Sequence, residues 1–103
     1  MRYRVVITET AWDDLLQIAQ TIAVENSARA ETLLTEMHDR CLRLEEFPES
    51  HTLVPDPLKR GVRRAVHGNY LIFFRVRGSV VQVLHVLHGA RDYLRLLFPE
   101  DER

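Results

Sequence analysis

Residues 61–92 constrain the fold most, because they hold three short runs rich in Val, Ile, Phe and Tyr that are separated by two glycine-containing pairs. The pairs are Gly68-Asn69 and Gly78-Ser79. Such pairs are typical of two-residue hairpin loops, since glycine adopts the positive φ that these turns need. The stretch therefore predicts an antiparallel meander with strands over 61–67, 70–77 and 80–88.

The meander is also the basic part of the chain. Residues 57–91 contain seven Lys or Arg and no Asp or Glu, whereas residues 1–56 contain eleven acidic and five basic residues. The last twelve residues, 92–103, are again acidic, and the formal net charge of the chain is −1. A basic sheet beside acidic helices predicts a negatively charged partner, such as nucleic acid or an acidic protein segment. The alternative is an evenly solvated surface without such a partner.

The first half of the chain predicts one strand and two helices. Tyr3, Val5 and Ile7 alternate with other residues in the period of a strand. Apolar residues at helical spacing then predict helices over 10–24 and 27–46, with Thr8 or Thr10 and Asn26 or Ser27 as N-caps. Pro48 cannot continue the second helix. Residues 48–60 form a surface connection, and 93–98 a short helix or a final strand.

We therefore expect a single α+β domain over residues 1–103. Its order is β-α-α-β-β-β, and a helix hairpin packs on one face of a small, mainly antiparallel sheet. The expected core residues come from both helices and from the meander: Leu15, Ile18, Leu33, Leu34, Met37, Leu44, Ile72, Phe74 and Val83.

The hairpin loops assign the meander residues to two faces, because directly paired residues share a face. The first face is nearly all apolar and should pack on the helices; it holds Ala65, Tyr70, Ile72, Phe74, Val76, Val81, Val83 and Leu87. The second face mixes arginine with large apolar residues; it holds Arg64, Leu71, Phe73, Arg75, Arg77, Gln82, Leu84, Val86 and His88. Unless the C-terminal segment covers it, this second face should expose an apolar patch that binds a partner.

The residues that could carry chemistry are few. Cys41 is the single cysteine, which excludes an intramolecular disulfide, and its place on an apolar helical stripe predicts a buried hydrophobe rather than a nucleophile. The five histidines lack metal-ligand spacing, so we expect neither a metal nor a cofactor. Residues 57–91 offer no carboxylate base, which leaves a self-sufficient nuclease poorly equipped. Without a signal peptide or a membrane-spanning stretch, the expected location is the cytoplasm.

The order of elements and several short motifs resemble the RelE/ParE superfamily of type II toxin–antitoxin toxins. The resemblance covers nearly the whole chain, and its most specific part is the run His88-Gly89-Ala90-Arg91-Asp92. The weaker motifs occur in the same order; they are Tyr3-x-Val5, Thr8-x-x-Ala11-x-x-Asp14-Leu15-x-x-Ile18, Phe47-Pro48, Gly61-x-Arg63, Tyr70-x-Ile72-x-Phe74-x-Val76 and Val83-x-x-Val86.

The superfamily has two functional branches, and this chain looks closer to the ParE branch. RelE-like members are ribosome-dependent endoribonucleases that cut messenger RNA, whereas ParE-like members poison DNA gyrase. Many nucleases carry an arginine directly after the tyrosine that opens the middle strand, where this chain has Leu71. Tyr93 also differs from the usual nuclease position. One departure from ParE-like sequences is Ser50-His51, where glycine is common.

The resemblance implies a toxin that inhibits gyrase without cofactor or membrane and forms a hetero-oligomer with a co-encoded antitoxin, which is ParD-like or another small antitoxin. The first alternative is a messenger RNA endoribonuclease, which would use His88, Arg91, Tyr93 and Arg64 on the ribosome. The second is an inactive toxin fold kept as an antitoxin-binding module. These alternatives differ in whether the chain is an enzyme: the gyrase-inhibiting toxin is not one, and the endoribonuclease is.

Two groups of binding residues follow from this reading. The antitoxin, as an acidic amphipathic segment, should bind the second face through Arg64, Leu71, Phe73, Arg75, Arg77, Leu84 and Val86. Gly89 lets the chain turn sharply after the last strand, and the residues beyond it should contact the target. Those residues are Arg91, Tyr93, Arg95 and Phe98. A clamp between Arg91 and Asp92 that only fixes the C-terminus is the alternative role.

Overall fold

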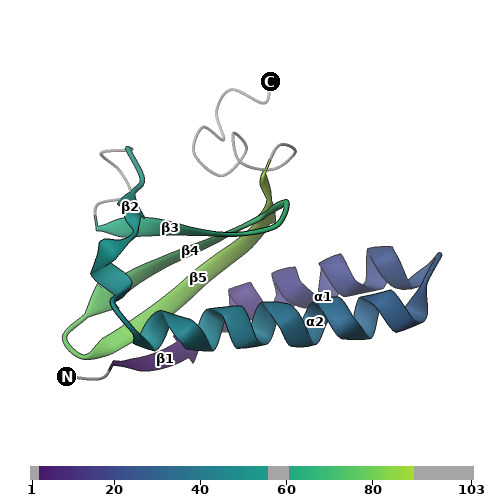
Figure 1. Cartoon of the computed structure of the whole chain (residues 1–103), viewed down its shortest axis with the longest axis horizontal. Helices are drawn as coiled ribbons and strands as arrows, with labels where there is room; N and C mark the ends of the chain where they lie inside the picture. The colour runs from purple at the N-terminus through teal and green to yellow at the C-terminus, as the bar shows by residue number, and fades with distance from the viewer. Residues whose placement is uncertain (1–2, 56–60, 90–103) are drawn as a thin grey trace.

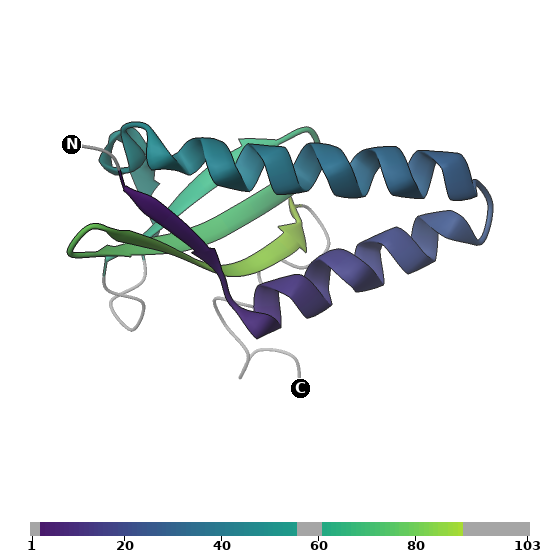
Figure 2. The same cartoon turned by 90° about the horizontal axis from the view of Figure 1, so that it is seen from below.

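The computed structural model describes residues 3–55 and 61–89 of the chain. A five-stranded sheet carries two long helices on one face (Figure 1). Its strands lie in the order β1 (Arg4–Ile7), β5 (Val80–His88), β4 (Tyr70–Arg77), β3 (Val62–His67) and β2 (Thr52–Leu53). The order of β1, two helices and a three-stranded meander confirms the predicted α+β fold. The turn between the helices extends past the sheet, so only one end of the helix hairpin is packed on strands (Figures 1 and 2). In the described part of the chain, no helix is long and apolar enough to cross a membrane.

Side-chain caps set where both helices begin. Helix α1 (Glu9–Ala23) follows Thr8, whose Oγ1 accepts a hydrogen bond from Ala11 N at 3.2 Å. The same hydroxyl donates to the Val83 carbonyl at 2.7 Å, which ties the start of α1 to the sheet. Helix α2 (Ser27–Leu42) follows Asn26, whose Oδ1 accepts from Arg29 N at 2.9 Å. Each cap satisfies a backbone donor that has no partner within the first turn.

The end of the second helix differs from the prediction. Helix α2 stops at Leu42 rather than 46 and continues as a short 3-10 turn, η1 (Arg43–Glu45). Phe47 then adopts a left-handed conformation with φ 52°, before η2 (Pro48–Ser50). This turn leaves Phe47 81% exposed, so Phe47 does not extend the apolar face of the helix into the core.

The predicted meander is confirmed. Strands β3 (Val62–His67), β4 (Tyr70–Arg77) and β5 (Val80–His88) pair antiparallel, and the two-residue loops contain Gly68 and Gly78 with φ 59°. Strand β1 (Arg4–Ile7) lies parallel to β5 at one edge. At the other edge, the connection over 48–60 contributes a strand that was not predicted, β2 (Thr52–Leu53), which pairs with β3.

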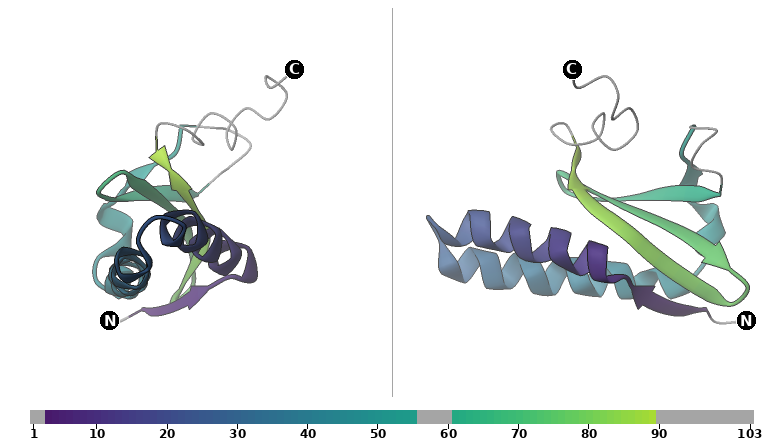
Figure 3. Two further views of the ribbon diagram at one scale, coloured as in Figure 1. Left: turned by 90° about the vertical axis from the view of Figure 1, so that its right-hand side faces the viewer. Right: turned by 180° about the vertical axis from the view of Figure 1, so that it is seen from behind.

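The main core lies between the helices and the first face of the sheet (Figure 3). Seven of the nine predicted core residues are buried there, and Ile18 and Leu34 pack against them while staying half-buried. Cys41 is also fully buried in this core. Burial raises the pKa of its thiol to about 11, so the thiol stays protonated at neutral pH. This agrees with its predicted role as a small hydrophobe.

A β-bulge in β5 overturns part of the predicted facing. Phe73 is opposite His85 and Phe74 is opposite Val83. Strand β5 therefore has one extra residue, Leu84, which has no counterpart on β4. An extra residue reverses the alternation of side chains beyond it. Val86 therefore points into the helix-side core, and Leu87 packs on the second face. The predicted faces of these two residues were wrong for this reason.

Candidate functional site

The second face of the sheet carries a small apolar cluster of its own. Its members are Val54, Val62 and Phe73, which are buried, and Leu71, Leu84 and Leu87, which are half-buried around them. We call these six residues the second-face cluster. Phe73 is only 1% exposed, so the expectation that it would be an exposed anchor was wrong. The backbone continues to pair beyond β2, where Val54 N donates to Val62 O at 2.8 Å, and this brings Val54 into the cluster with Phe73.

Basic side chains border the second-face cluster. Arg75 and Gln82 are cross-strand partners, and Arg75 Nε donates to Gln82 Oε1 at 2.8 Å. Arg64 is half-buried opposite Phe73, and Arg77 is exposed at the end of β4. Because residues 61–89 contain no Asp or Glu, these cations face no carboxylate from their own strands. The second face therefore offers half-buried leucines next to positive charge.

Not all predicted antitoxin-binding residues share this surface. Arg64, Leu71, Phe73, Arg75 and Leu84 belong to it by register or packing, whereas Val86 is 1% exposed inside the main core. Leu87 takes the place expected for Val86. The sequence gives no signal of this exchange, because Val83, Leu84, Val86 and Leu87 are all apolar and fit either face.

The structure separates two residues of the nuclease alternative. His88 is paired with Tyr70, which packs against the main core, and the two rings meet edge to face with centroids 5.6 Å apart. Arg64 is paired with Phe73 on the opposite face. The prediction that His88 lies on the second face was wrong, again because of the bulge. Within the described residues, the buried His88 Nδ1 has no hydrogen-bond partner.

The remaining predicted residues, Arg91, Tyr93, Arg95 and Phe98, lie outside the described residues. So does the predicted short helix or strand over 93–98, together with Asp92. Their roles as target contacts, or as acid, base and cation in a nuclease, stay predictions.

Sequence reasoning missed the contact that holds the bulged strand to the first helix. Asp14 Oδ2 on α1 accepts a hydrogen bond from Val86 N at 3.0 Å and lies 3.2 Å from His85 Nδ1. Strand β1 ends opposite Val83, so the edge of β5 beyond it is open for this carboxylate. In the described part of the chain, no cluster of His, Cys, Asp and Glu could hold a metal ion.

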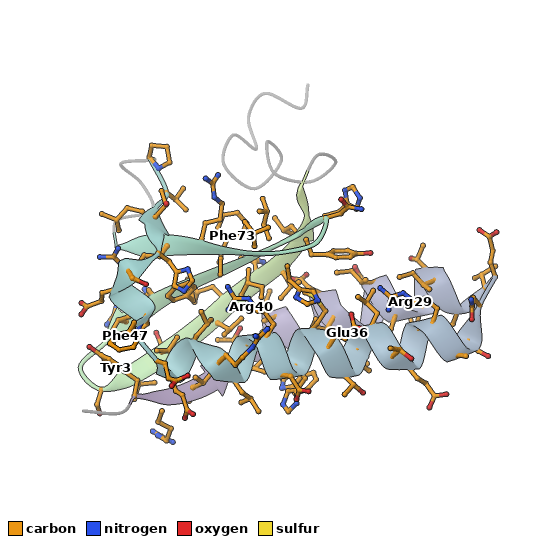
Figure 4. All side chains as sticks on the ribbon, in the orientation of Figure 1. Tyr3, Arg29, Glu36, Arg40, Phe47 and Phe73 are labelled. Carbon is orange, nitrogen blue, oxygen red and sulfur yellow. The ribbon has the colours of Figure 1, made fainter. Side chains whose placement is uncertain are left out.

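An acidic hollow beside the end of α2 was also missed. It has a volume of about 640 Å³ and is lined by Tyr3 and by residues 45–50, among them three glutamates and the exposed Phe47. The hydroxyl of Tyr3 donates to Glu49 Oε1 at 3.2 Å, and the negative charge of Glu49 raises the pKa of Tyr3. Tyr3 and Phe47 lie close to each other at this end of the molecule (Figure 4).

Comparison with solved structures shows the same fold in three bacterial toxins. The chromosomal ParDE toxin–antitoxin system of P. aeruginosa contains a chain 20% identical to this one, with a TM-score of 0.74 over 84% of this chain and 96% of that one. The toxin–antitoxin complex RelBE2 of Mycobacterium tuberculosis gives 23% identity and a TM-score of 0.64 over 85% and 99%. A mutant of the E. coli toxin RelE in the free state gives 16% identity and a TM-score of 0.63 over the full length of both chains.

At the sequence level, no curated protein matches the chain. A family model does: the one described as the ParE toxin of the type II toxin–antitoxin system parDE matches residues 5–93. The match includes both helices, the second face described above and all of the sheet except Arg4 at the start of β1. The chain therefore belongs to the ParE toxin family of type II toxin–antitoxin systems, within the RelE/ParE superfamily.

Proposed function

We propose that this toxin inhibits DNA gyrase and is neutralised by a co-encoded antitoxin that covers the second face. The observation that carries the choice of gyrase over messenger RNA is the separation of Arg64 from His88. A nuclease needs a base, an acid and cations around one phosphodiester. Here the bulge turns His88 toward Tyr70 and leaves Arg64 on the other face. A gyrase poison needs only binding, because trapping the enzyme on cleaved DNA requires no proton transfer by the toxin.

The middle strand supports the same choice. Leu71 stands where a nuclease would carry an arginine, and it packs in the second-face cluster. An apolar side chain in that place adds to a binding surface and supplies no charge for a transition state. The match to the ParE family model agrees with this reading.

The second face suits an acidic, amphipathic antitoxin segment. Leu71, Leu84 and Leu87 are half-buried and can lose further exposed area on binding, while Arg75 and Arg77 can pair with carboxylates. Such a segment would order as it binds. The similar proteins from P. aeruginosa and M. tuberculosis are described as a toxin–antitoxin system and a toxin–antitoxin complex, which supports a partner of this kind.

The target is tested by two assays run side by side on the purified toxin. One measures supercoiling and DNA cleavage by gyrase, and the other measures messenger RNA cleavage in a translating extract. We expect inhibition of supercoiling with accumulation of cleaved DNA, and intact messenger RNA. Cleaved messenger RNA with unaffected gyrase would replace this proposal with the endoribonuclease. Inertness in both assays, with normal antitoxin binding, would identify an inactive binding module.

The antitoxin surface is tested by a matched pair of substitutions. Leu71→Asp places a charge in the second-face cluster, whereas Leu16→Asp places one on α1 at a residue that is 46% exposed. Phe73→Asp is unsuitable, because Phe73 is buried and a charge there would cost folding. We expect Leu71→Asp to weaken antitoxin binding at least about a hundredfold, as for a central apolar anchor, and Leu16→Asp to leave it unchanged. The reverse result would place the antitoxin on the helix hairpin.

A further inference from the structure

Two arginines and a histidine from separate elements converge beside the outer edge of β3. Arg40 comes from α2, His51 follows η2, and Arg63 belongs to β3. Arg63 Nη1 donates to the His51 carbonyl at 2.6 Å, and the His51 ring meets Phe74 edge to face at 5.5 Å. Burial lowers the pKa of His51, and the charges of Arg40 and Arg63 lower it further. Two positive charges thus lie near a histidine ring whose protonated form they disfavour.

No carboxylate balances this cluster within the described residues. The ion pairs there join Arg29 and His67 to Glu36, and His85 to Asp14; none involves Arg40, His51 or Arg63. Arg43 adds a further positive charge nearby. Burial lowers the pKa of Arg40, and the charge of Arg43 lowers it further. Uncompensated cations that are half-buried favour an anion, because bringing one in relieves the repulsion.

The adjoining edge of the sheet is open. Strand β2 pairs with β3 only at Arg63 and Arg64, and Val54 N donates to Val62 O. Alternate residues of a strand turn their backbone groups to the same edge, so Val66 also turns its N–H and C=O outward. Among the described residues, the one side chain that bonds to this outward backbone is Arg40, whose Nε donates to Val66 O at 3.4 Å. The Val66 side chain is 54% exposed.

We infer that Arg40, His51 and Arg63, together with the open edge at Val66, form a docking site for an acidic, extended segment of a partner polypeptide. A backbone placed beside Val66 can accept from its N–H and donate to its C=O, as in strand addition. A carboxylate on that segment would reach the cations. The chemistry favours a polypeptide over nucleic acid, because a phosphodiester backbone offers no donor to the Val66 carbonyl. The inference goes beyond the proposed function, since it concerns another surface and does not depend on what the toxin inhibits.

The site can be tested on the full-length chain by NMR, with the Val66 amide and the His51 ring as reporters. The probe is a ten-residue peptide of alternating Val and Glu, and its matched control alternates Val and Lys. A ten-nucleotide single-stranded DNA is the third arm. We expect the Val-Glu peptide alone to give saturable shifts at both reporters, and the pKa of His51 to rise when it is bound. Shifts confined to the second-face cluster, or stronger shifts at both reporters with DNA, would overturn the inference.

Two pairs of variants separate the parts of the site. Arg40→Gln should weaken binding of the Val-Glu peptide by about tenfold or more, the range for a lost hydrogen bond to a charged group. Arg4→Gln, at an exposed position on β1 at the opposite edge of the sheet, should not change it. Val66→Pro removes the outward N–H, which proline tolerates at a sheet edge, and should abolish binding, whereas Val66→Ala should retain it. Amide spectra verify the fold of each variant. Equal binding by Arg40→Gln and wild type, or by Val66→Pro and Val66→Ala, would refute the site.

Discussion

The two faces of the sheet differ in how much of their apolar surface is covered. On the helix-covered face, Ile72, Phe74, Val81 and Val83 are each 0% exposed beneath α1 and α2. On the second face, Phe73 is as fully buried, yet the leucines around it are only half-buried and arginines stand beside them. One face is completed by the chain's own helices, and the described residues only partly cover the other.

The contrast shows how one strand can serve both stability and recognition. Neighbouring residues of β4 point to opposite sides, so Phe74 enters the main core while Phe73 anchors the second-face cluster. A change on one side should act mainly on folding, and a change at the margin of the other mainly on binding. The following predictions test this division, from the largest expected effect to the smallest.

Truncation of adjacent phenylalanines should separate the two clusters. Phe74→Ala should lower the free energy of unfolding by about 3–5 kcal/mol, because it opens a cavity in a core that is closed on all sides. Phe73→Ala should cost about 3 kcal/mol, the low end of that range, since its half-buried neighbours can relax into the space. Urea unfolding of both variants measures the difference. Equal losses would show that the second-face cluster is as rigid as the main core.

Asp14 should be the most sensitive polar residue at the bulge. Asp14→Ala removes the acceptor of Val86 N–H and the partner of His85, and an unsatisfied backbone donor there should cost about 1–3 kcal/mol. Asp13→Ala is the matched control: its side chain is exposed, and its effect should stay within about 0.5 kcal/mol. Hydrogen exchange at Val86 should accelerate only in the first variant. Similar losses in both variants would trace the effect to the charge at the helix start instead.

The bordering arginines should affect the rate of association more than stability. If the antitoxin binds the second face as proposed, Arg77→Ala should slow association by a few fold at low salt, and the difference should shrink as salt rises. Unfolding should be unchanged, because Arg77 is exposed. Stopped-flow mixing with the antitoxin at two salt concentrations measures this. An effect on dissociation alone, with no salt dependence, would indicate a buried contact.

The smallest effect should come from His51. Its pKa is lowered in the folded chain by burial and by Arg40 and Arg63, so the unfolded chain, with a histidine pKa near 6.5, binds more protons. Stability should therefore fall as the pH drops through about 6.5 and below. Urea unfolding at pH 7.5 and 5.5 should show a larger loss for wild type than for His51→Gln. An identical loss in both proteins would mean that His51 is not repelled as the structure indicates.

Most of the fold could be predicted from local patterns. The meander was predictable because Gly68 and Gly78 fix two-residue loops, and the helices because their apolar residues recur at helical spacing. Strand β2 could not be predicted, because two residues within a proline-containing connection carry no period. The left-handed turn at Phe47 was hidden as well, since Phe47 follows Leu44 at helical spacing in the sequence.

The candidate site was less predictable, because it depends on a single extra residue. The bulge at Leu84 moves Val86 to the core, Leu87 to the second face and His88 beside Tyr70. Nothing local marks it, since every residue from Val83 to Leu87 except His85 is apolar. Asp14, which binds the bulged strand, lies more than seventy residues away in the chain. Long-range contacts of this kind are invisible to periodicity.

The central claim is that toxicity depends on binding surfaces and not on acid–base chemistry at His88. The most direct measurement is growth inhibition by His88→Gln on controlled expression, compared with wild type and with His67→Gln, whose histidine contacts Glu36 instead. Circular dichroism and antitoxin binding verify that each variant is folded. We predict that all three proteins remain toxic to within a few fold. A loss of about 10²–10⁴-fold for His88→Gln alone, the size expected for a missing general acid or base, would contradict the claim and favour the endoribonuclease.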